Sequence, residues 1–191
     1  LAWRGQVVEG FGAASYLDAQ LPNDNYYLYP FDAPRVLPII SSRGCPFGCT
    51  FCYQPLTKRY RSRSLDNFFA EVDLLVRRYR IGMLAIVDEL FALKRERVRE
   101  FCARIKPYNL TWIAQLRVNL VDDELLALLA DAGCFYISYG IESACDKILT
   151  AMRKQITVAD IDRALAATYA HGIGIQGNLI FGNREETRLT A

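Results

Sequence analysis

The feature that most constrains the fold of this chain is a fivefold alternation between short apolar runs and segments of helical periodicity. The runs are continuously apolar, which is typical of parallel strands covered on both faces. Parallel strands need crossover connections, and the helical segments between the runs supply them. The pattern therefore predicts an α/β fold, either an open doubly wound sheet or most of a barrel. The predicted strands are residues 36–42, 83–89, 110–116, 134–142 and 173–182.

Polar caps and glycines mark the ends of the helices. Ser, Thr and Asp side chains can accept hydrogen bonds from a first helical turn, and glycine adopts the left-handed conformation that often ends a helix. Three predicted helices are bounded in this way, by Ser64 and Gly82, by Asp122 and Gly133, and by Thr157 and Gly172.

Polar and charged residues follow the predicted strands. In both candidate folds, functional residues lie at the carboxyl ends of the strands. We therefore expect the cysteine-containing loop and the segments "DEL", "QLRVN", "GIES" and "GNREE" to converge on one edge of the sheet.

Composition and charge set the broad class. The 191 residues are 52% hydrophobic and 23% charged, which is typical of a globular domain, and the net charge of +2 offers no extended basic surface for nucleic acid. No apolar stretch reaches the length of a membrane helix, so we expect a cytoplasmic protein that needs neither a membrane nor nucleic acid as a partner. We expect residues 1–35 to be a lead-in linker after an absent upstream domain, and residues 36–191 to be one core domain truncated at its C-terminus.

Three cysteines crowd the loop "RGCPFGCTFCYQP" at residues 43–55. Thiolates held this close repel one another, which favours a cation between them. Structural zinc normally takes four protein ligands, and no fourth Cys or His lies nearby in the sequence. The spacing therefore favours an iron–sulfur site with an open position, with a structural metal site as the alternative. We expect Cys102, Cys134 and Cys145 to be small apolar residues of the core.

The cysteine spacing carries a family resemblance. Cys45-x-x-x-Cys49-x-x-Cys52 after a first strand, with Phe51 before the last cysteine, resembles the motif of the radical S-adenosylmethionine (radical SAM) superfamily. The resemblance implies a partial (βα)6 barrel with five repeats visible and the sixth missing. It also implies an enzyme in which Cys45, Cys49 and Cys52 hold a 4Fe-4S cluster, whose open iron binds S-adenosylmethionine (SAM) and whose electron cleaves it to start radical chemistry.

The resemblance also implies a set of SAM contacts at the strand ends. Asp88 and Glu89 match a position that binds the amino group of SAM, although an acidic pair that caps a turn is the alternative. Glu142 in "GIES" is expected to approach the nucleoside, and Lys154 matches a basic position near the carboxylate of SAM, with an ordinary surface lysine as the alternative. The remaining implied cofactor contacts are Phe51, Gln115 and Asn178.

The subgroup is indicated by "LAWRGQVV", "LPNDNYYLYP", "DELF" and "GIES" together. These stretches are most similar to radical SAM proteins with an upstream cobalamin-binding domain, many of which are methyltransferases. The implied partners are a small-molecule substrate and an electron donor such as a reductase, flavodoxin or ferredoxin. One departure is "GNREET", where the family usually has Gly-x-Pro-Gly-Glu-Thr. A radical SAM enzyme without cobalamin and a non-catalytic iron–sulfur or structural metal-binding domain are the alternatives.

Overall fold

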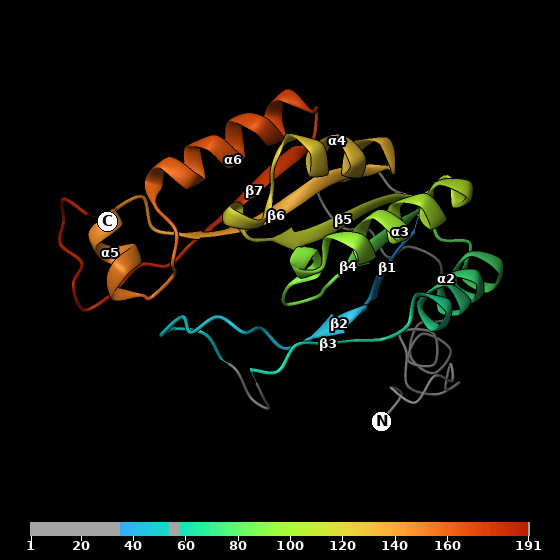
Figure 1. Ribbon diagram of the computed structural model, residues 1–191, viewed down its shortest axis with the longest axis horizontal. Helices are drawn as coiled ribbons and strands as arrows, with labels where there is room; N and C mark the ends of the chain where they lie inside the picture. The colour runs from blue at the N-terminus through green and yellow to red at the C-terminus, as the bar shows by residue number, and fades with distance from the viewer. Residues whose placement is uncertain (1–34, 54–57, 191) are drawn as a thin grey trace.

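The centre of the fold is a parallel sheet of five strands (Figure 1). The computed structural model describes residues 35–53 and 58–190. The predicted lead-in therefore lies outside the described residues, except for Arg35. Every pair of neighbouring strands in the sheet is parallel. From one edge to the other, the strands are β1 (Val36–Ile39), β4 (Met83–Ile86), β5 (Thr111–Leu116), β6 (Cys134–Glu142) and β7 (Gly174–Leu179).

The order of the strands in the sheet follows their order along the chain. A doubly wound sheet reverses this order at a switch point, whereas a barrel adds each new strand on the same side. The observed order therefore selects the barrel between the two predicted folds. The α/β fold with five βα repeats of a partial barrel is confirmed, and the described residues contain no sixth strand of this sheet.

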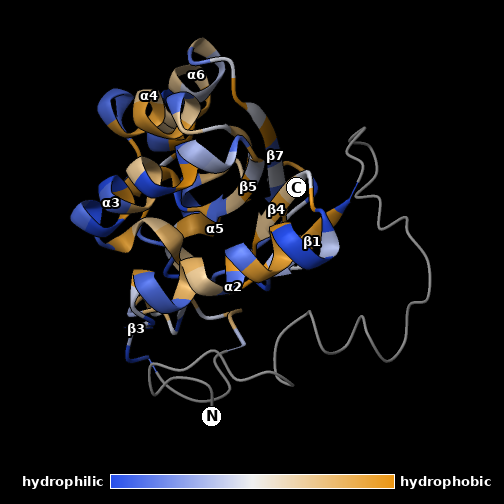
Figure 2. Cartoon of the chain, turned by 90° about the vertical axis from the view of Figure 1, so that its right-hand side faces the viewer, coloured by the Kyte–Doolittle hydropathy of each residue, from blue (hydrophilic) through white to orange (hydrophobic). Residues whose placement is uncertain are grey.

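The helices gather on one side of the sheet (Figure 2). Right-handed crossovers that always advance in the same direction place every connecting helix on the same face. The connecting elements are α2 (Leu65–Tyr79), η1 (Phe91–Leu93), α3 (Arg95–Ile105), η2 (Lys106–Tyr108), η3 (Val118–Leu120), α4 (Asp123–Asp131), α5 (Asp146–Ala151) and α6 (Val158–Ala170). None of the helices in the described part of the chain is both long and apolar enough to cross a membrane.

Alternate strand residues divide between the two faces of the sheet. Leu84 and Trp112 belong to the main core between sheet and helices, where the rings of Phe101 and Trp112 meet edge to face with centroids 5.1 Å apart. Met83 and Ala85 belong to a much smaller apolar cluster on the opposite face. The sheet thus has one thoroughly covered face and one face with little apolar cover.

The capping predictions are confirmed, with one correction at the end of α2. The side chains of Ser64, Asp122 and Thr157 accept hydrogen bonds from the first turns of α2, α4 and α6. Helix α2 ends before Gly82, however, because Arg80 takes the left-handed conformation at φ 50° and its N–H donates to the carbonyl of Val76.

Two strand predictions are corrected by the structure. The predicted strand 36–42 is divided, because β1 ends at Ile39 and β2 (Ser42–Arg43) pairs antiparallel with β3 (Arg61–Ser62) in a separate ribbon. Strand β7 is predicted to be buried, yet most of its residues are exposed. It lies at the edge of the sheet and pairs only with β6, so fewer neighbours cover it.

Candidate functional site

The segments that follow the strands meet at the carboxyl edge of the sheet. The cysteine loop, residues 44–53, is held there by hydrogen bonds to three other segments of the chain. Gly44 N–H donates to the Glu89 carboxylate after β4 at 2.8 Å, and Thr50 N–H donates to the Met152 carbonyl after α5 at 2.9 Å. The third contact joins the loop to Arg117, after β5. The segments "DEL" and "QLRVN" thus meet the cysteine loop at one edge, as predicted.

The three cysteines of this loop are accessible to solvent. Cys45 and Cys49 are half-buried and Cys52 is exposed. In the part of the chain that the structure describes, no three His, Cys, Asp or Glu side chains gather around a position for a single ion. An iron–sulfur cluster makes a different demand, because its cysteines bind different iron atoms and surround the cluster instead of meeting at one point. Three soft thiol donors on one accessible loop suit that group.

The other three cysteines have different surroundings. Cys102 and Cys134 are buried, and Cys145 is half-buried at the start of α5. Burial raises the pKa of the Cys102 thiol to about 12 and raises the pKa of the Cys134 thiol further. Both thiols are therefore neutral near pH 7, as the prediction of core residues requires. The same prediction is wrong for Cys145, which is only half-buried because it caps the start of α5.

Asp88 and Glu89 lie next to each other but have different roles. Asp88 is fully buried, and its carboxylate accepts hydrogen bonds from Ser41 N–H, the Ser41 hydroxyl and the Ser42 hydroxyl, each at 2.6 Å. This carboxylate is engaged within the protein, so the geometry does not support the predicted direct contact with a cofactor. Glu89 is exposed and holds the start of the cysteine loop through Gly44.

Glu142 and Lys154 form a buried ion pair. The Lys154 Nζ lies 2.7 Å from Glu142 Oε1, and the two side chains are only 5% and 9% exposed. Glu142 takes a left-handed conformation at φ 68°, at an irregularity in the pairing of β6 with β7. Lys154 also lies 5.6 Å from the centre of the Phe51 ring in the cysteine loop. Three predicted site residues are thus brought together, and Lys154 is not the surface lysine of the alternative interpretation.

Gln115 and Asn178 lie on the face of the sheet opposite the helices. Gln115 is in register with Ser138 on β6, and Asn178 Nδ2 donates to the Ser138 hydroxyl at 2.9 Å. Gln176 in turn donates to Asn178 Oδ1 at 3.0 Å. These residues form a row of polar side chains on the sparsely covered face of the sheet, and the row leads toward the edge where the cysteine loop lies. Its members are Gln115, Ser138, Gln176 and Asn178.

Arg117 is the site residue that the sequence did not single out. It is buried at 7% exposure, and its guanidinium donates to Cys49 Sγ at 3.5 Å and to the Lys154 carbonyl. Its guanidinium carbon also lies 3.8 Å from the centre of the Phe47 ring. The available signal was its position directly after β5, on the same edge as the cysteine loop.

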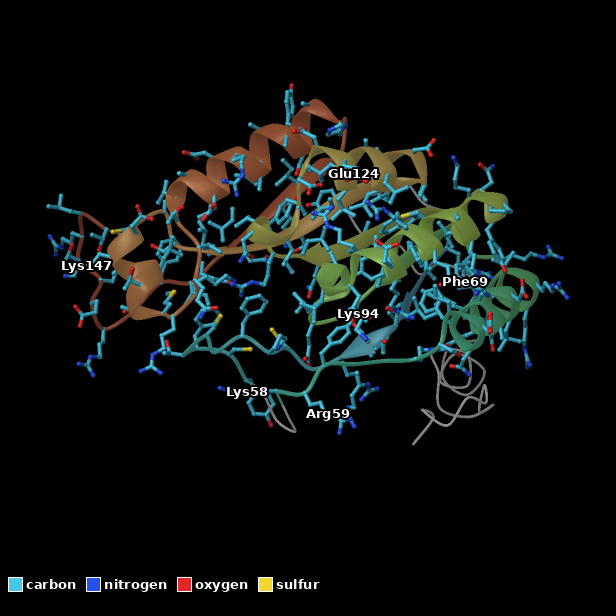
Figure 3. All side chains as sticks on the ribbon, viewed as in Figure 1. Lys58, Arg59, Phe69, Lys94, Glu124 and Lys147 are labelled. Atoms are coloured by element: carbon cyan, nitrogen blue, oxygen red, sulfur yellow. The ribbon has the colours of Figure 1, made fainter. Side chains whose placement is uncertain are left out.

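Basic residues lie beside the cysteine loop on its outer side. Lys58 and Arg59 are exposed on the segment that leads into β3, and Figure 3 shows them at the margin of the molecule. A β-carbon placed on Gly48 would lie 3.9 Å from the Lys58 ammonium, so this charge is close to the loop.

Comparisons with known proteins agree with this geometry. The sequence model of the radical SAM superfamily matches residues 39–188. An uncharacterized methyltransferase of Pyrococcus horikoshii is 32% identical over 178 residues, which cover 88% of this chain and 39% of that protein. The anaerobic magnesium-protoporphyrin IX monomethyl ester cyclase of Rubrivivax gelatinosus is 30% identical over 172 residues, covering 87% of this chain and 31% of the cyclase. The chain thus spans less than half the length of these relatives.

The fold is also similar to that of solved structures. The radical SAM methyltransferase TsrM from Kitasatospora setae, whose structure has cobalamin and a [4Fe-4S] cluster bound, superposes with a TM-score of 0.73. The sequences are 23% identical, and the match covers 80% of this chain and 30% of TsrM. The likeness supports the partial barrel.

Proposed function

Because this chain belongs to the radical SAM superfamily, we propose that it is the core of an enzyme that binds a 4Fe-4S cluster and SAM at the carboxyl edge of its sheet. The observation that carries the proposal is the cysteine loop itself. Cys45, Cys49 and Cys52 lie on one accessible loop, which three other segments fix at that edge. These three cysteines would hold a cluster with one iron open for SAM, and that cluster would supply the electron for cleavage of the sulfonium bond.

The residues around the loop divide into holders of the loop and candidates for SAM contact. Glu89 fixes the start of the loop, and buried Asp88 fixes the chain that leads into it through Ser41 and Ser42. Gln115 and Asn178 present amide groups on the open face of the sheet, where they can bind the ribose and adenine of SAM.

Phe51 and the ion pair of Glu142 with Lys154 form the other wall of the proposed SAM site. The pair is internally neutral, so it offers hydrogen bonds at this wall without a net charge. Gly140 lies beside the pair and leaves room for it, because a β-carbon at this position would lie 2.5 Å from Glu142 Oε1.

The reaction that we propose is methyl transfer, with cobalamin as a further cofactor. The support comes from the relatives: several are named methyltransferases, including a bacteriochlorophyllide d C-12(1)-methyltransferase from Chlorobaculum tepidum at 28% identity. In this proposal, residues 36–191 form the radical SAM core and residues 1–35 connect it to a cobalamin-binding domain. A small-molecule substrate would bind near the open face of the sheet.

The electron donor would approach from the side of the cysteine loop. Lys58 and Arg59 place positive charge there, which suits an acidic one-electron carrier such as a flavodoxin or ferredoxin. Cys102, Cys134 and Cys145 form no disulfide, which suits a reducing compartment such as the cytoplasm.

The test of the proposed function is reconstitution of the protein with iron and sulfide without oxygen. We expect about four irons and four sulfides per chain, together with a change in the cluster spectrum when SAM is added. Changing Cys45, Cys49 or Cys52 to Ala should abolish the chromophore. The matched controls are Ala variants of Cys102 and Cys145, which should keep it.

The alternative is a non-catalytic iron–sulfur or structural metal-binding domain. Such a domain has no open iron, so SAM would leave its spectrum unchanged. A cluster that survives loss of Cys49, or one that ignores SAM, would therefore refute the proposed function.

A further inference from the structure

Arg117 carries a buried positive charge that no carboxylate of the described residues balances. Its side chain makes hydrogen bonds to Asn119 Oδ1, to Cys49 Sγ and to the Lys154 carbonyl. In the described part of the chain it makes no ion pair with an Asp or Glu side chain, although it is only 7% exposed. Buried charges in proteins are normally paired, because an isolated charge in a poorly solvated position is costly. The position of Arg117 therefore requires an anionic neighbour.

The group that meets this requirement is the Cys49 sulfur. The guanidinium donates to Cys49 Sγ at 3.5 Å, and among the polar partners of Arg117 only this sulfur would carry negative charge, as a thiolate ligand of the proposed cluster. The direction of approach is restrained from two sides. The Phe47 ring covers one face of the guanidinium at 3.8 Å, and the Lys154 carbonyl accepts from its other end. A planar, permanently charged group held in this way donates with a defined geometry.

We infer that Arg117 is a positioning residue that donates a charged hydrogen bond to the Cys49 thiolate and thereby raises the reduction potential of the cluster. This inference rests on the proposed function, because it requires the cluster that the three cysteines would hold. Hydrogen bonds to the sulfurs and the net charge around a cluster are among the factors that set its potential. A fixed positive charge at a ligand sulfur stabilises the reduced form more than the oxidised form, because the reduced form carries one more negative charge.

The step that this contact biases is a one-electron reduction. An external reductant, dithionite in the assay or a ferredoxin-type carrier in the cell, gives up one electron and the cluster gains it. No covalent bond is formed or broken and no proton is transferred. Removal of the charge should therefore shift the midpoint potential without a change in the number of electrons or in the iron content.

The test is a potentiometric titration of the reconstituted protein, followed by the electron paramagnetic resonance signal of the reduced cluster. We expect Arg117→Gln to disfavour reduction about tenfold, which lowers the midpoint potential by about 59 mV for one electron. Arg117→Lys keeps the charge but loses the planar fork, so we expect a smaller loss of about threefold. The control is Arg153→Gln, which removes an exposed charge from the neighbouring segment and should leave the potential unchanged.

The outcomes separate this inference from the proposed function. Wild-type protein that binds no four-iron cluster refutes both. A loaded Arg117→Gln variant with the wild-type potential, or a shift of the same size in Arg153→Gln, overturns the inference alone. If Arg117→Gln does not retain iron, Arg117→Lys decides: a lowered potential supports the inference and the wild-type potential overturns it. Loss of iron from both variants would mean that Arg117 only holds the cysteine loop in place, and this result also overturns the inference.

Discussion

Replacement of Lys154 by methionine tests the buried ion pair at the centre of the candidate site. The change removes the ammonium that lies 2.7 Å from Glu142 Oε1 and leaves that carboxylate 9% exposed without its partner. Loss of one member of a buried pair typically costs about 3–5 kcal/mol. We expect the lower end, about 3 kcal/mol, because the 9% exposure of the Glu142 side chain leaves it some contact with water. With a urea m-value of about 2.5 kcal/mol/M, the unfolding midpoint should fall by roughly 1.2 M.

The assay is urea unfolding of the metal-free protein, followed by circular dichroism. The control is Lys106→Met, which removes an exposed pair with Asp131 of similar length, 2.6 Å, and should cost less than about 1 kcal/mol. The double variant Glu142→Gln with Lys154→Met should recover part of the loss, because no uncompensated charge is left buried. If Lys154→Met lowers the midpoint no more than Lys106→Met does, the burial argument is wrong.

Further changes test other parts of the site. Gly140→Ala should lower the free energy of unfolding by about 1–3 kcal/mol, because the added β-carbon would lie 2.5 Å from Glu142 Oε1. In the control variant Gly48→Ala, the added β-carbon would lie 3.9 Å from a single atom, so the free energy of unfolding should fall far less. Asp88→Ala should lower the free energy of unfolding by about 2–4 kcal/mol in the same urea assay, because three buried donors lose their acceptor. A variant as stable as the wild type would contradict this prediction. Burial raises the pKa of Cys102 to about 12, so a thiol reagent at pH 8 should modify this cysteine only after the protein unfolds. Mass spectrometry of the native protein after treatment with the reagent measures the modification. Rapid labelling of Cys102 in the native protein would contradict the prediction.

Much of the fold follows from local features of the sequence. The apolar runs around Leu84 and Trp112 predict parallel strands, because continuous apolar runs are typical of them. The expected cover on both faces is found on one face only. The caps Ser64, Asp122 and Thr157 act within one helical turn, so a few neighbouring residues suffice to identify them. The choice between barrel and open sheet depends on which strands become neighbours, and periodicity carries no information on that.

The site was less predictable, because its contacts join residues far apart in the sequence. Asp88 and Glu89 are adjacent, yet one is fully buried beneath Ser41 and the other is exposed, a difference that depends on how the preceding strand is packed. Lys154 becomes buried only because β6 places Glu142 beside it. Arg117 contacts Cys49, which lies 68 positions earlier in the chain. Contacts over such separations arise from the strand order and leave no local pattern.

The short ribbon of β2 and β3 fixes both ends of the segment that carries the cysteines, through the pairs Ser42 with Ser62 and Arg43 with Arg61. The length-dependent part of the entropy cost of closing a loop of about 17 residues is about 2.5 kcal/mol, and the folded chain has met this cost before any iron binds. Binding of the cluster then has to order only the residues within a loop that is already closed. In small zinc domains, by contrast, metal binding and folding are a single event. Assembly of this protein should therefore proceed in two separable stages, so that a chelator would return it to a folded and reloadable apo form.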